Sequence, residues 1–483
     1  MIRISDIWDR RTATHVAAAL FLGLILRLFF VLHFPAADSD SEMYEDLGRN
    51  VVDNHMYAYD FGRGAVPTDI RVPGYPLFVG FVYLFSPSEQ AILVAQAIVD
   101  LGTCLLVAAL AGLLAPDGSR RRVATAALWL SATCPFVANY AAVAMTEVLA
   151  TFFTAAALVI LVWANQRELL RPGPLWFLGG AMVGLGALVR PETPITLAAP
   201  AVVLSWHWMK SGFKPTDWPR LIRTGLLLAA GMFIALLPWA ARNWITLHEV
   251  EFLTDRYIHS PGSYVPVGFY QWTHTWLSSY WDVDHVLNRL EEAPLYIADF
   301  PPSAFDSGIE RARVESLLES QHQGSFEISP DADQQFSELA RERTALNPLR
   351  TYVTVPLRRS LTFWFTPRTE LLPYSGEWWP LLRSSEDYDG PFALAFLFAM
   401  LNFLYAGLAL AGAFRMWRQY GVALLAAFLV ARTLFIAVEH YTVEPRFVLP
   451  CIPAVLALGA LAWAGESGGE LRLDGARSNI SDS

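Results

Sequence analysis

Acidic side chains crowd one short stretch near the start of the chain, directly after an apolar run. Asp38, Asp40, Glu42 and Glu45 lie there, and Tyr44 follows Asp40 by four positions. Because residues four apart share a face of a helix, a helical turn would place Asp40 beside Tyr44. A carboxylate held in this way can take the proton of an attacking hydroxyl group. A loop of acids that only faces water is the structural alternative.

An arginine and a rigid turn close the same polar stretch. Arg71 precedes Pro73-Gly74-Tyr75-Pro76, in which two prolines and a glycine restrict the backbone. This turn would hold Arg71 at the membrane edge, where it is a candidate site residue. An arginine that merely extends its charge to the membrane surface is the alternative.

The composition is that of a membrane protein. Of the 483 residues, 54% are hydrophobic and only 17% are charged, and several apolar runs reach the roughly 20 residues that a membrane-spanning helix needs. The basic residues form no stripe with interleaved aromatic residues, which argues against nucleic acid as a partner. The three cysteines lie in apolar runs and show neither a disulfide nor a metal-binding pattern.

The apolar runs predict an all-α, polytopic membrane protein with about ten transmembrane helices. The first span covers about 15–34; a cleaved signal peptide is the alternative, but its apolar part is usually only about 7–15 residues. The run 76–85 is too short to span and is predicted to be an interfacial or a re-entrant segment. The other spans are predicted at 89–114, twice within 123–163, and at 174–189, 194–208, 224–240, 392–414, 420–438 and 447–463.

Positive charge sets the direction of these spans. With both termini in the cytoplasm, the clusters of Arg and Lys fall in cytoplasmic loops, as the positive-inside rule requires. These clusters are Arg3, Arg10 and Arg11; Arg120 to Arg122; Arg167 and Arg171; Lys210, Lys214, Arg220 and Arg223; Arg415 and Arg418; and Arg472 and Arg477. The acidic stretch and Arg71 then face the extracytoplasmic side.

Further ionisable groups fall on that same face. They are Glu147, Arg190, Glu192, Arg242, His440, Glu444 and Arg446. Ionisable groups at membrane depth are costly, usually functional, and need partners. For Glu147 a purely structural ion pair with Arg190 is the alternative. Arg242 is predicted at headgroup depth, where its planar guanidinium group could bind two phosphate oxygens at once; an interface anchor is the alternative. Arg27 and Arg432 lie inside spans and require partners, which we expect among these acids.

The spacing of His440 and Glu444, four residues apart, could place two metal ligands on one helix face. No third ligand lies close in the sequence. A phosphate site built on Arg446 and oriented by Glu444 is therefore the preferred interpretation, and the need for a divalent metal is left open.

The chain divides into four predicted parts. Residues 1–240 form an N-terminal transmembrane domain, with its first outer loop at 35–73. Residues 241–390 form an extracytoplasmic region with interfacial helices, one of them at 352–365. Residues 391–465 carry the last spans, and the tail 466–483 is predicted to be disordered. Within the outer region, Ser329-Pro330-Asp331 predicts a helix start.

Taken in order, these motifs resemble those of the GT-C superfamily of integral-membrane glycosyltransferases. The bacterial branch similar to protein O-mannosyltransferases and to the aminoarabinose transferase of lipid A is the nearest in pattern. The motifs are an acid four residues before a Tyr, Arg-x-Pro-Gly-Tyr-Pro, Thr-Glu opening a span, Arg-Pro-Glu, Pro-Trp-x-x-Arg-Asn and Glu-x-Arg-Phe-x-x-Pro. The resemblance covers about residues 15–460. Ser41 and Phe447 depart from residues common in the family.

The resemblance implies a glycosyltransferase that moves a sugar from a polyprenyl-phosphate donor to a hydroxyl group of a glycan, lipid or protein of the cell envelope. If the transfer is a single displacement, it inverts the anomeric centre. The site would face the periplasm, in the inner membrane of a bacterium. Asp40 would be the catalytic residue, and Arg71, Arg242 and Arg446 would bind the donor phosphate. The supporting residues would be Asp38, Tyr44, Glu147, Arg190, Glu192, His440 and Glu444.

Two other functions are compatible with a polytopic chain. A transporter or flippase of lipid-linked sugars would place its polar groups at the bilayer midplane, whereas these groups sit at the outer ends of spans. A non-catalytic scaffold gives no reason for acids and arginines to converge. We expect substrate specificity to lie in the outer region, with Tyr264, Tyr270 and Trp272 as candidates.

Overall fold

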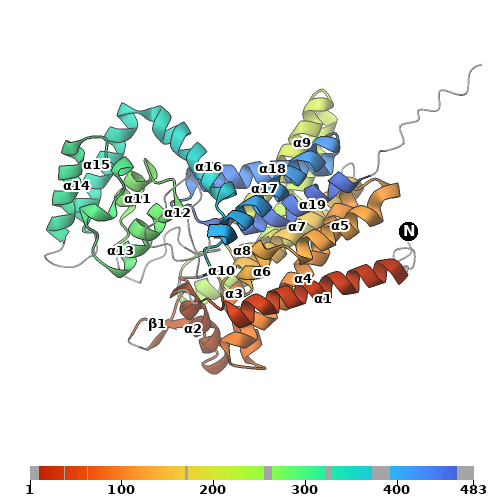
Figure 1. Cartoon of the computed structure of the whole chain (residues 1–483), viewed down its shortest axis with the longest axis horizontal. Helices are drawn as coiled ribbons and strands as arrows, with labels where there is room; N and C mark the ends of the chain where they lie inside the picture. Colours follow the sequence, from red (N-terminus) through yellow and green to blue (C-terminus); the bar gives the residue numbers. More distant parts are fainter. Residues whose placement is uncertain are drawn as a thin grey trace, which may run out of the picture.

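The computed structural model describes residues 10–36, 39–62, 64–168, 172–254, 264–321, 328–372 and 392–464, and most of these are helical. The strands among them, β1 Ala58–Asp60 and β2 Ala65–Pro67, form one antiparallel hairpin. A long helical bundle carries a further group of helices at one end (Figure 1). The predicted all-α class is confirmed. Asp38 and the tail 466–483 lie outside the described residues.

Seven stretches of the described chain are long and apolar enough to cross a membrane, so the protein is an integral membrane protein. All seven coincide with predicted spans, while the total of ten and the direction of the spans stay predictions. The stretches contain α1 Arg10–His33, α4 Glu89–Leu114, α7 Glu147–Arg167, α10 Trp218–Thr246, α17 Phe392–Arg415, α18 Tyr420–Leu434 and α19 Ile452–Ala460.

The other three predicted spans are shorter helices: α5 Arg120–Ala132, α8 Pro174–Ala187 and α9 Ala198–Lys210. At about 1.5 Å per residue, none of them alone covers the roughly 30 Å of a hydrocarbon core. α5 ends just before Pro135, which opens α6 Pro135–Tyr140, because proline is tolerated in the first turn of a helix but not in its interior. The run predicted to be interfacial or re-entrant forms α3 Gly74–Tyr83, which is apolar and short.

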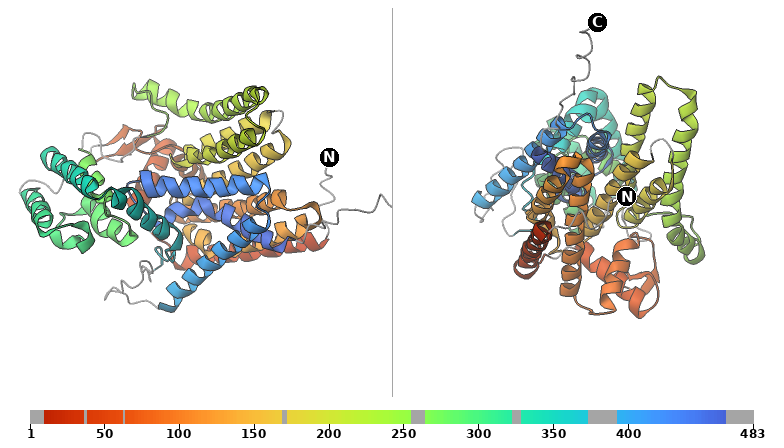
Figure 2. Two further views of the ribbon diagram at one scale, coloured as in Figure 1. Left: turned by 90° about the horizontal axis from the view of Figure 1, so that it is seen from above. Right: turned by 90° about the vertical axis from the view of Figure 1, so that its right-hand side faces the viewer.

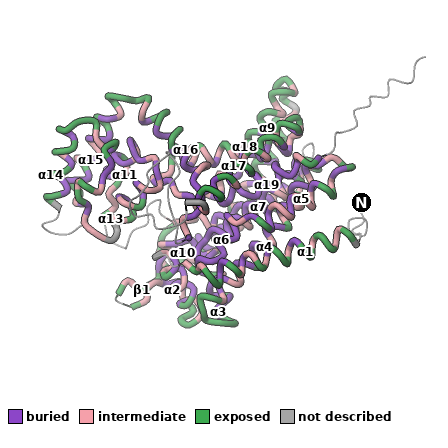
Figure 3. The backbone as a smooth tube through the Cα atoms, in the orientation of Figure 1, coloured by how far each residue is buried: buried purple, intermediate pink, exposed green. Residues whose placement is uncertain are grey.

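Burial separates central from peripheral helices (Figure 3). In α7 and in the stretch around α19, 72% and 83% of the apolar window is buried, against 28% in α1 and 22% in α10. The exposed side chains of peripheral helices include Phe21 and Phe414, the kind of surface that lipid covers. α8 and α10 approach so closely that a Cβ atom on Gly231 would lie 2.0 Å from the Phe177 carbonyl oxygen. Small residues permit such close contact between membrane helices.

Arg27, inside α1, is fully buried and pairs with Asp100 of α4. Its Nε donates to Asp100 Oδ2 at 2.8 Å, and Nη1 donates to the carbonyl oxygens of Gly23 and Ala132 at 2.9 and 2.8 Å. Arg27 was expected to pair with one of the acids near the candidate site. Its partner is instead Asp100, which lies inside a neighbouring span. Arg432, by contrast, lies 3.6 Å from one of those acids, Glu192.

Two groups of elements cover one end of the bundle. The first is α2 Ser39–Asp53 with the β1–β2 hairpin, and the second projects beyond the bundle (Figure 2). Ser329 caps α15 by accepting a hydrogen bond from the Ala332 N–H, which confirms the predicted helix start. The second group comprises α11 Val267–His274, α12 Tyr280–Asp282, α13 Arg289–Glu292, α14 Gly308–Gln321, α15 Pro330–Leu346 and α16 Val355–Phe365.

Candidate functional site

A cavity of about 990 Å³, here called the central cavity, lies between the end of the bundle and the two groups of elements that cover it. Its walls come from α2, the turn before α3, the start of α7, the α8–α9 connection, α11 to α13 and the segment between α18 and α19. Nine predicted site residues line it: Asp40, Tyr44, Arg71, Glu147, Arg190, Glu192, His440, Glu444 and Arg446. Widely separated motifs therefore meet in one place.

Asp40 lies between two arginines. It sits in the first turn of α2, where a negative charge is favoured by the helix dipole. The Arg71 guanidinium donates a short hydrogen bond to Asp40 Oδ1, and Arg446 Nη1 lies 3.9 Å from Oδ2. Tyr44, on the same helix as predicted, packs its ring 5.6 Å from the Arg71 guanidinium. The carboxylate thus occupies a position between two cations where a phosphate group could also bind.

The charged neighbours keep Asp40 ionised. Burial raises the pKa of Asp40, but the opposite effect of Arg71 and Arg446 is larger. The net pKa therefore lies below the ordinary value. Burial also raises the pKa of Tyr44 to about 12, so its hydroxyl group stays protonated at neutral pH. Asp40 is therefore an acceptor of protons in the resting protein, although a weak one while both arginines face it.

Arg190 joins two acids in the lining of the cavity. Its Nη1 lies 2.5 Å from Glu147 Oε1 and its Nε lies 2.7 Å from Glu192 Oε1. Burial raises the pKa of Glu192, but Arg190 and Arg432 bring it down to about 2, so this acid is ionised. The ion pair of Glu147 with Arg190 has the geometry of the structural alternative that the sequence left open.

Arg446 has several carboxylates within reach. Its Nε lies 2.6 Å from Glu444 Oε2 and 3.9 Å from Glu147 Oε1. The Thr442 hydroxyl group donates to Glu444 Oε1 at 3.3 Å. Burial lowers the pKa of the nearby His440 to about 3, so its ring is neutral and adds no cation. Arg446 keeps 22% of its side chain exposed, so a ligand in the cavity can reach it.

Arg242 is not part of the cavity lining. Its Nη1 donates to the Thr68 carbonyl oxygen at 2.8 Å and its Nη2 to the Tyr57 carbonyl oxygen at 2.6 Å. Tyr57 in turn donates its hydroxyl hydrogen to the Arg71 carbonyl oxygen at 2.8 Å. These contacts favour a role for Arg242 in holding the loop that presents Arg71, and its predicted role as a phosphate ligand stays a prediction.

The outer region contributes cavity residues that the sequence analysis did not single out. Tyr280, Asp284, His285 and Arg289 line the central cavity, and so does Tyr270, one of the predicted specificity residues. The other two predicted residues lie elsewhere. Trp272 is buried in the outer group, and Tyr264 donates to Asp333 Oδ2 at 2.9 Å. A π-helix at Val283–Asn288 carries Asp284 and His285, and sequence periodicity does not reveal such a segment.

A second cavity of about 520 Å³ lies beside the central one and shares Met145, Tyr280, Glu444 and Arg446 with it. Its lining includes Glu370, which accepts a hydrogen bond from the Tyr140 hydroxyl group at 2.5 Å. Arg446 therefore lines both cavities, and a ligand in either one could contact it.

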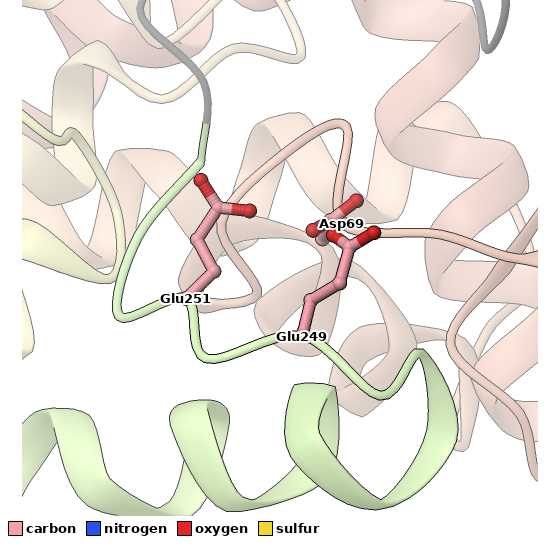
Figure 4. A group of neighbouring side chains, drawn as sticks. All are labelled: Asp69, Glu249 and Glu251. Atoms are coloured by element: carbon pink, nitrogen blue, oxygen red, sulfur yellow. The ribbon is translucent and has the colours of Figure 1, made fainter.

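One group of three acids in the described residues brings its carboxylate oxygens within 4.8 Å of one another: Asp69, Glu249 and Glu251 (Figure 4). The side chains come from the loop before Arg71 and from the segment after α10. Glu249 is exposed, and exposed acids commonly lie together without an ion, so these acids alone do not indicate a cation site. The predicted His440–Glu444 pair does not join a group of this kind among the described residues.

Comparisons with known proteins bear on the fold. Residues 73–239 match the family model described as dolichyl-phosphate-mannose-protein mannosyltransferase. A solved structure of the archaeal oligosaccharyltransferase AglB from Archaeoglobus fulgidus, in complex with an inhibitory peptide and a dolichol-phosphate, is 16% identical, with a TM-score of 0.51 over 94% of this chain and 50% of its own. Another structure of that enzyme, tethered with an acceptor peptide, is 16% identical with a TM-score of 0.52. The match covers 95% of this chain and 50% of the AglB chain. This chain has the GT-C fold.

In this GT-C fold Asp40, Arg71 and Arg446 line one cavity, whereas Arg242 does not line it. The chain spans about half the length of the AglB structures it matches. ArnT from Cupriavidus metallidurans, bound to undecaprenyl phosphate, is 12% identical over 94% of this chain and 77% of its own, but its TM-score of 0.38 is too low to compare the folds. No curated protein matches the chain by sequence.

Proposed function

We propose that the protein is an inverting glycosyltransferase that moves a sugar from a polyprenyl-phosphate donor to a hydroxyl group of a cell-envelope acceptor. The reaction takes place on the extracytoplasmic face of a bacterial inner membrane. The observation that carries the proposal is the placement of Asp40 between Arg71 and Arg446 in a large cavity of a GT-C fold. The family model matched by residues 73–239 and the dolichol-phosphate bound to AglB support the choice of donor.

The proposed reaction is a single displacement at the sugar C1 atom. The acceptor oxygen forms the new bond to C1, and the bond from C1 to the phosphate oxygen breaks, so the electron pair leaves with polyprenyl phosphate. The acceptor proton passes to Asp40 and then to solvent. Attack from the side opposite the leaving group inverts the anomeric centre, as in inverting glycosidases. The leaving phosphate is a weak base, so it needs positive charge more than a proton.

Arg71 and Arg446 supply that charge. Arg71 Nε is buried and has no hydrogen-bond partner among the described residues, so one donor is free for a ligand. Four acids (Asp40, Glu147, Glu192 and Glu444) balance four arginines (Arg71, Arg190, Arg432 and Arg446) in the cluster. A phosphate group must therefore compete with Asp40 for the two arginines that face it. This competition would release Asp40 from its cations and make it a stronger base as the donor binds.

The deciding experiment offers the purified protein in lipid nanodiscs a panel of undecaprenyl-phosphate sugars and measures the release of undecaprenyl phosphate. We expect release with one donor class, faster when a hydroxyl acceptor such as a cell-envelope glycan extract is added. The Asp40→Asn variant serves as the blank. If no donor is consumed, while labelled donor crosses the bilayer of proteoliposomes, the protein is a transporter of lipid-linked sugars and the proposal is wrong.

Replacing Arg446 by alanine is expected to lower kcat/KM for the donor by about 100-fold, the typical cost of removing one preorganised donor of transition-state charge. The loss should appear in the rate of undecaprenyl phosphate release. Arg358→Ala, which removes an exposed arginine of α16, is the matched control and should retain full activity. Equal activity of the two variants would remove Arg446 from the phosphate site.

The pH dependence of kcat/KM and of kcat should show whether bound phosphate replaces Asp40 as the partner of Arg71 and Arg446. In the free protein, Arg71 and Arg446 hold its pKa below the ordinary value, with Arg190 adding to the effect and Tyr44 neutral beside it. The acid limb of kcat/KM, which reports the free enzyme, should therefore lie below the usual range of an aspartate. Bound phosphate takes the arginines, so the acid limb of kcat should lie at higher pH. Coincident limbs would contradict the exchange.

A further inference from the structure

Two buried arginines of the outer region contact the segment that carries Glu444 and Arg446. Arg359 lies on α16 and Arg368 follows that helix, and their exposed fractions are 0% and 1%. The sequence analysis placed Arg359 with Arg358 on a helix at the membrane surface; Arg358 is exposed, but Arg359 points into the protein. Neither buried arginine forms an ion pair with a described carboxylate. A buried cation without an anion is costly, so hydrogen bonds must compensate for it.

Arg359 donates to carbonyl oxygens within and just after the π-helix Phe435–Glu439, which follows α18. Its Nη2 donates to Ile436 O at 3.2 Å, to Thr442 O at 2.8 Å and, over a short distance, to His440 O. Its Nη1 lies 2.7 Å from His274 Nδ1 of α11. Because arginine can only donate, His274 Nδ1 accepts. One side chain therefore ties two outer helices to the segment after α18.

Arg368 binds the other end of the same segment. Its Nη1 donates to Pro445 O at 3.0 Å, and its Nη2 donates to Phe363 O at 2.7 Å. Its backbone has a φ of 67°, in the left-handed region that is costly for residues other than glycine. Such a conformation persists only when its surroundings enforce it, and it is common near functional sites.

The segment 440–445 needs these donors because its backbone lacks regular partners. The π-helix Phe435–Glu439 ends before it, and the 3₁₀-helix that starts at Pro445 follows it. Carbonyl oxygens outside a helix ladder must find other donors when they are buried. The planar guanidinium group can serve several carbonyls at fixed angles, which an ammonium group cannot do as well.

We propose that Arg359 and Arg368 are positioning residues that hold segment 440–445, and through it Arg446, at the phosphate end of the site. Arg446 directly follows the segment, and its 3.9 Å approach to Asp40 Oδ2 depends on where the segment lies. The positioning itself follows from the hydrogen bonds, whereas its effect on catalysis rests on the proposed function.

The first test is hydrogen–deuterium exchange on the full-length protein in nanodiscs. Arg359→Met and Arg368→Met should raise deuterium uptake across 436–446, and Arg359→Lys should raise it less. Arg358→Met, one position away and exposed, is the matched control and should leave uptake unchanged. Uptake that stays at the wild-type level in both buried variants would overturn the proposal, whether or not the protein proves to be a transferase. If Arg359→Met does not fold, Arg359→Lys and Arg368→Met decide the question.

The second test asks whether Arg359 acts through Arg446. Arg359→Met should weaken binding of undecaprenyl phosphate and lower kcat/KM by about 10- to 100-fold, since small displacements of a catalytic group have costs of this size. In a protein that already carries Arg446→Ala, the same change should add less than about 3-fold, because coupled residues are not additive. Full additivity would show a merely structural role and contradict the proposal. Wild-type protein that neither binds undecaprenyl phosphate nor releases it would instead overturn the proposed function.

Discussion

Asp40→Asn should reduce sugar transfer by about 1,000-fold or more, near the upper end of what a general base contributes. The amide retains the shape of the side chain but cannot take a proton from the acceptor hydroxyl group. The change also removes the anion that competes for Arg71 and Arg446, so the donor KM should stay the same or fall while kcat collapses. Initial rates of undecaprenyl phosphate release over a range of donor concentrations measure both quantities.

The control for this experiment is Glu42→Gln. Glu42 lies on the same helix, two residues along, and is exposed, so the change removes an equal charge without entering the cavity. We expect its kinetics to match the wild type. Full activity of Asp40→Asn would exclude Asp40 as the base. A loss confined to donor KM would make it a ligand of the donor instead.

Asp100→Ala should destabilise the folded protein by about 3–5 kcal/mol, the usual cost of removing one partner from a buried ion pair. Arg27 would remain charged inside the bundle, with only carbonyl oxygens and the Cys104 sulfur as partners. Reversible unfolding in detergent micelles, monitored by tryptophan fluorescence, measures the loss of stability. Neither Arg27 nor Asp100 lines the central cavity, so folded variant protein should keep its activity.

The double variant Arg27→Met with Asp100→Leu separates charge from packing. With both charges gone, most of the lost stability should return, because apolar residues can replace a buried ion pair at little cost. Asp117→Ala breaks the ion pair with Arg120, in which the Asp117 side chain is 93% exposed, and should cost less than about 1 kcal/mol. If Asp100→Ala were no worse than Asp117→Ala, the buried pair would contribute nothing to stability.

Local patterns predicted a good part of this protein. The length and apolar content of seven runs indicated membrane helices, because only a helix satisfies its own backbone in lipid. The four-residue spacing of Asp40 and Tyr44 placed both on α2, and Ser329 marked the start of α15, because these features depend on neighbours within one helical turn. The arrangement of basic loops put the ionisable motifs on one face, and nine of those residues line one cavity.

Only the tertiary structure decided which of these groups meet. Arg27 and Arg432 looked alike in the sequence, yet one pairs with Asp100 inside the bundle and the other lies beside Glu192 at the site. Arg358 and Arg359 are adjacent, but a 100° turn of the helix exposes the first and buries the second. Arg242 binds the carbonyl oxygens of Thr68 and Tyr57, contacts that no sequence pattern indicated, and its role as a phosphate ligand stays a prediction. The sequence determines which side chains can carry charge, whereas their partners depend on contacts between distant segments, which no local pattern encodes.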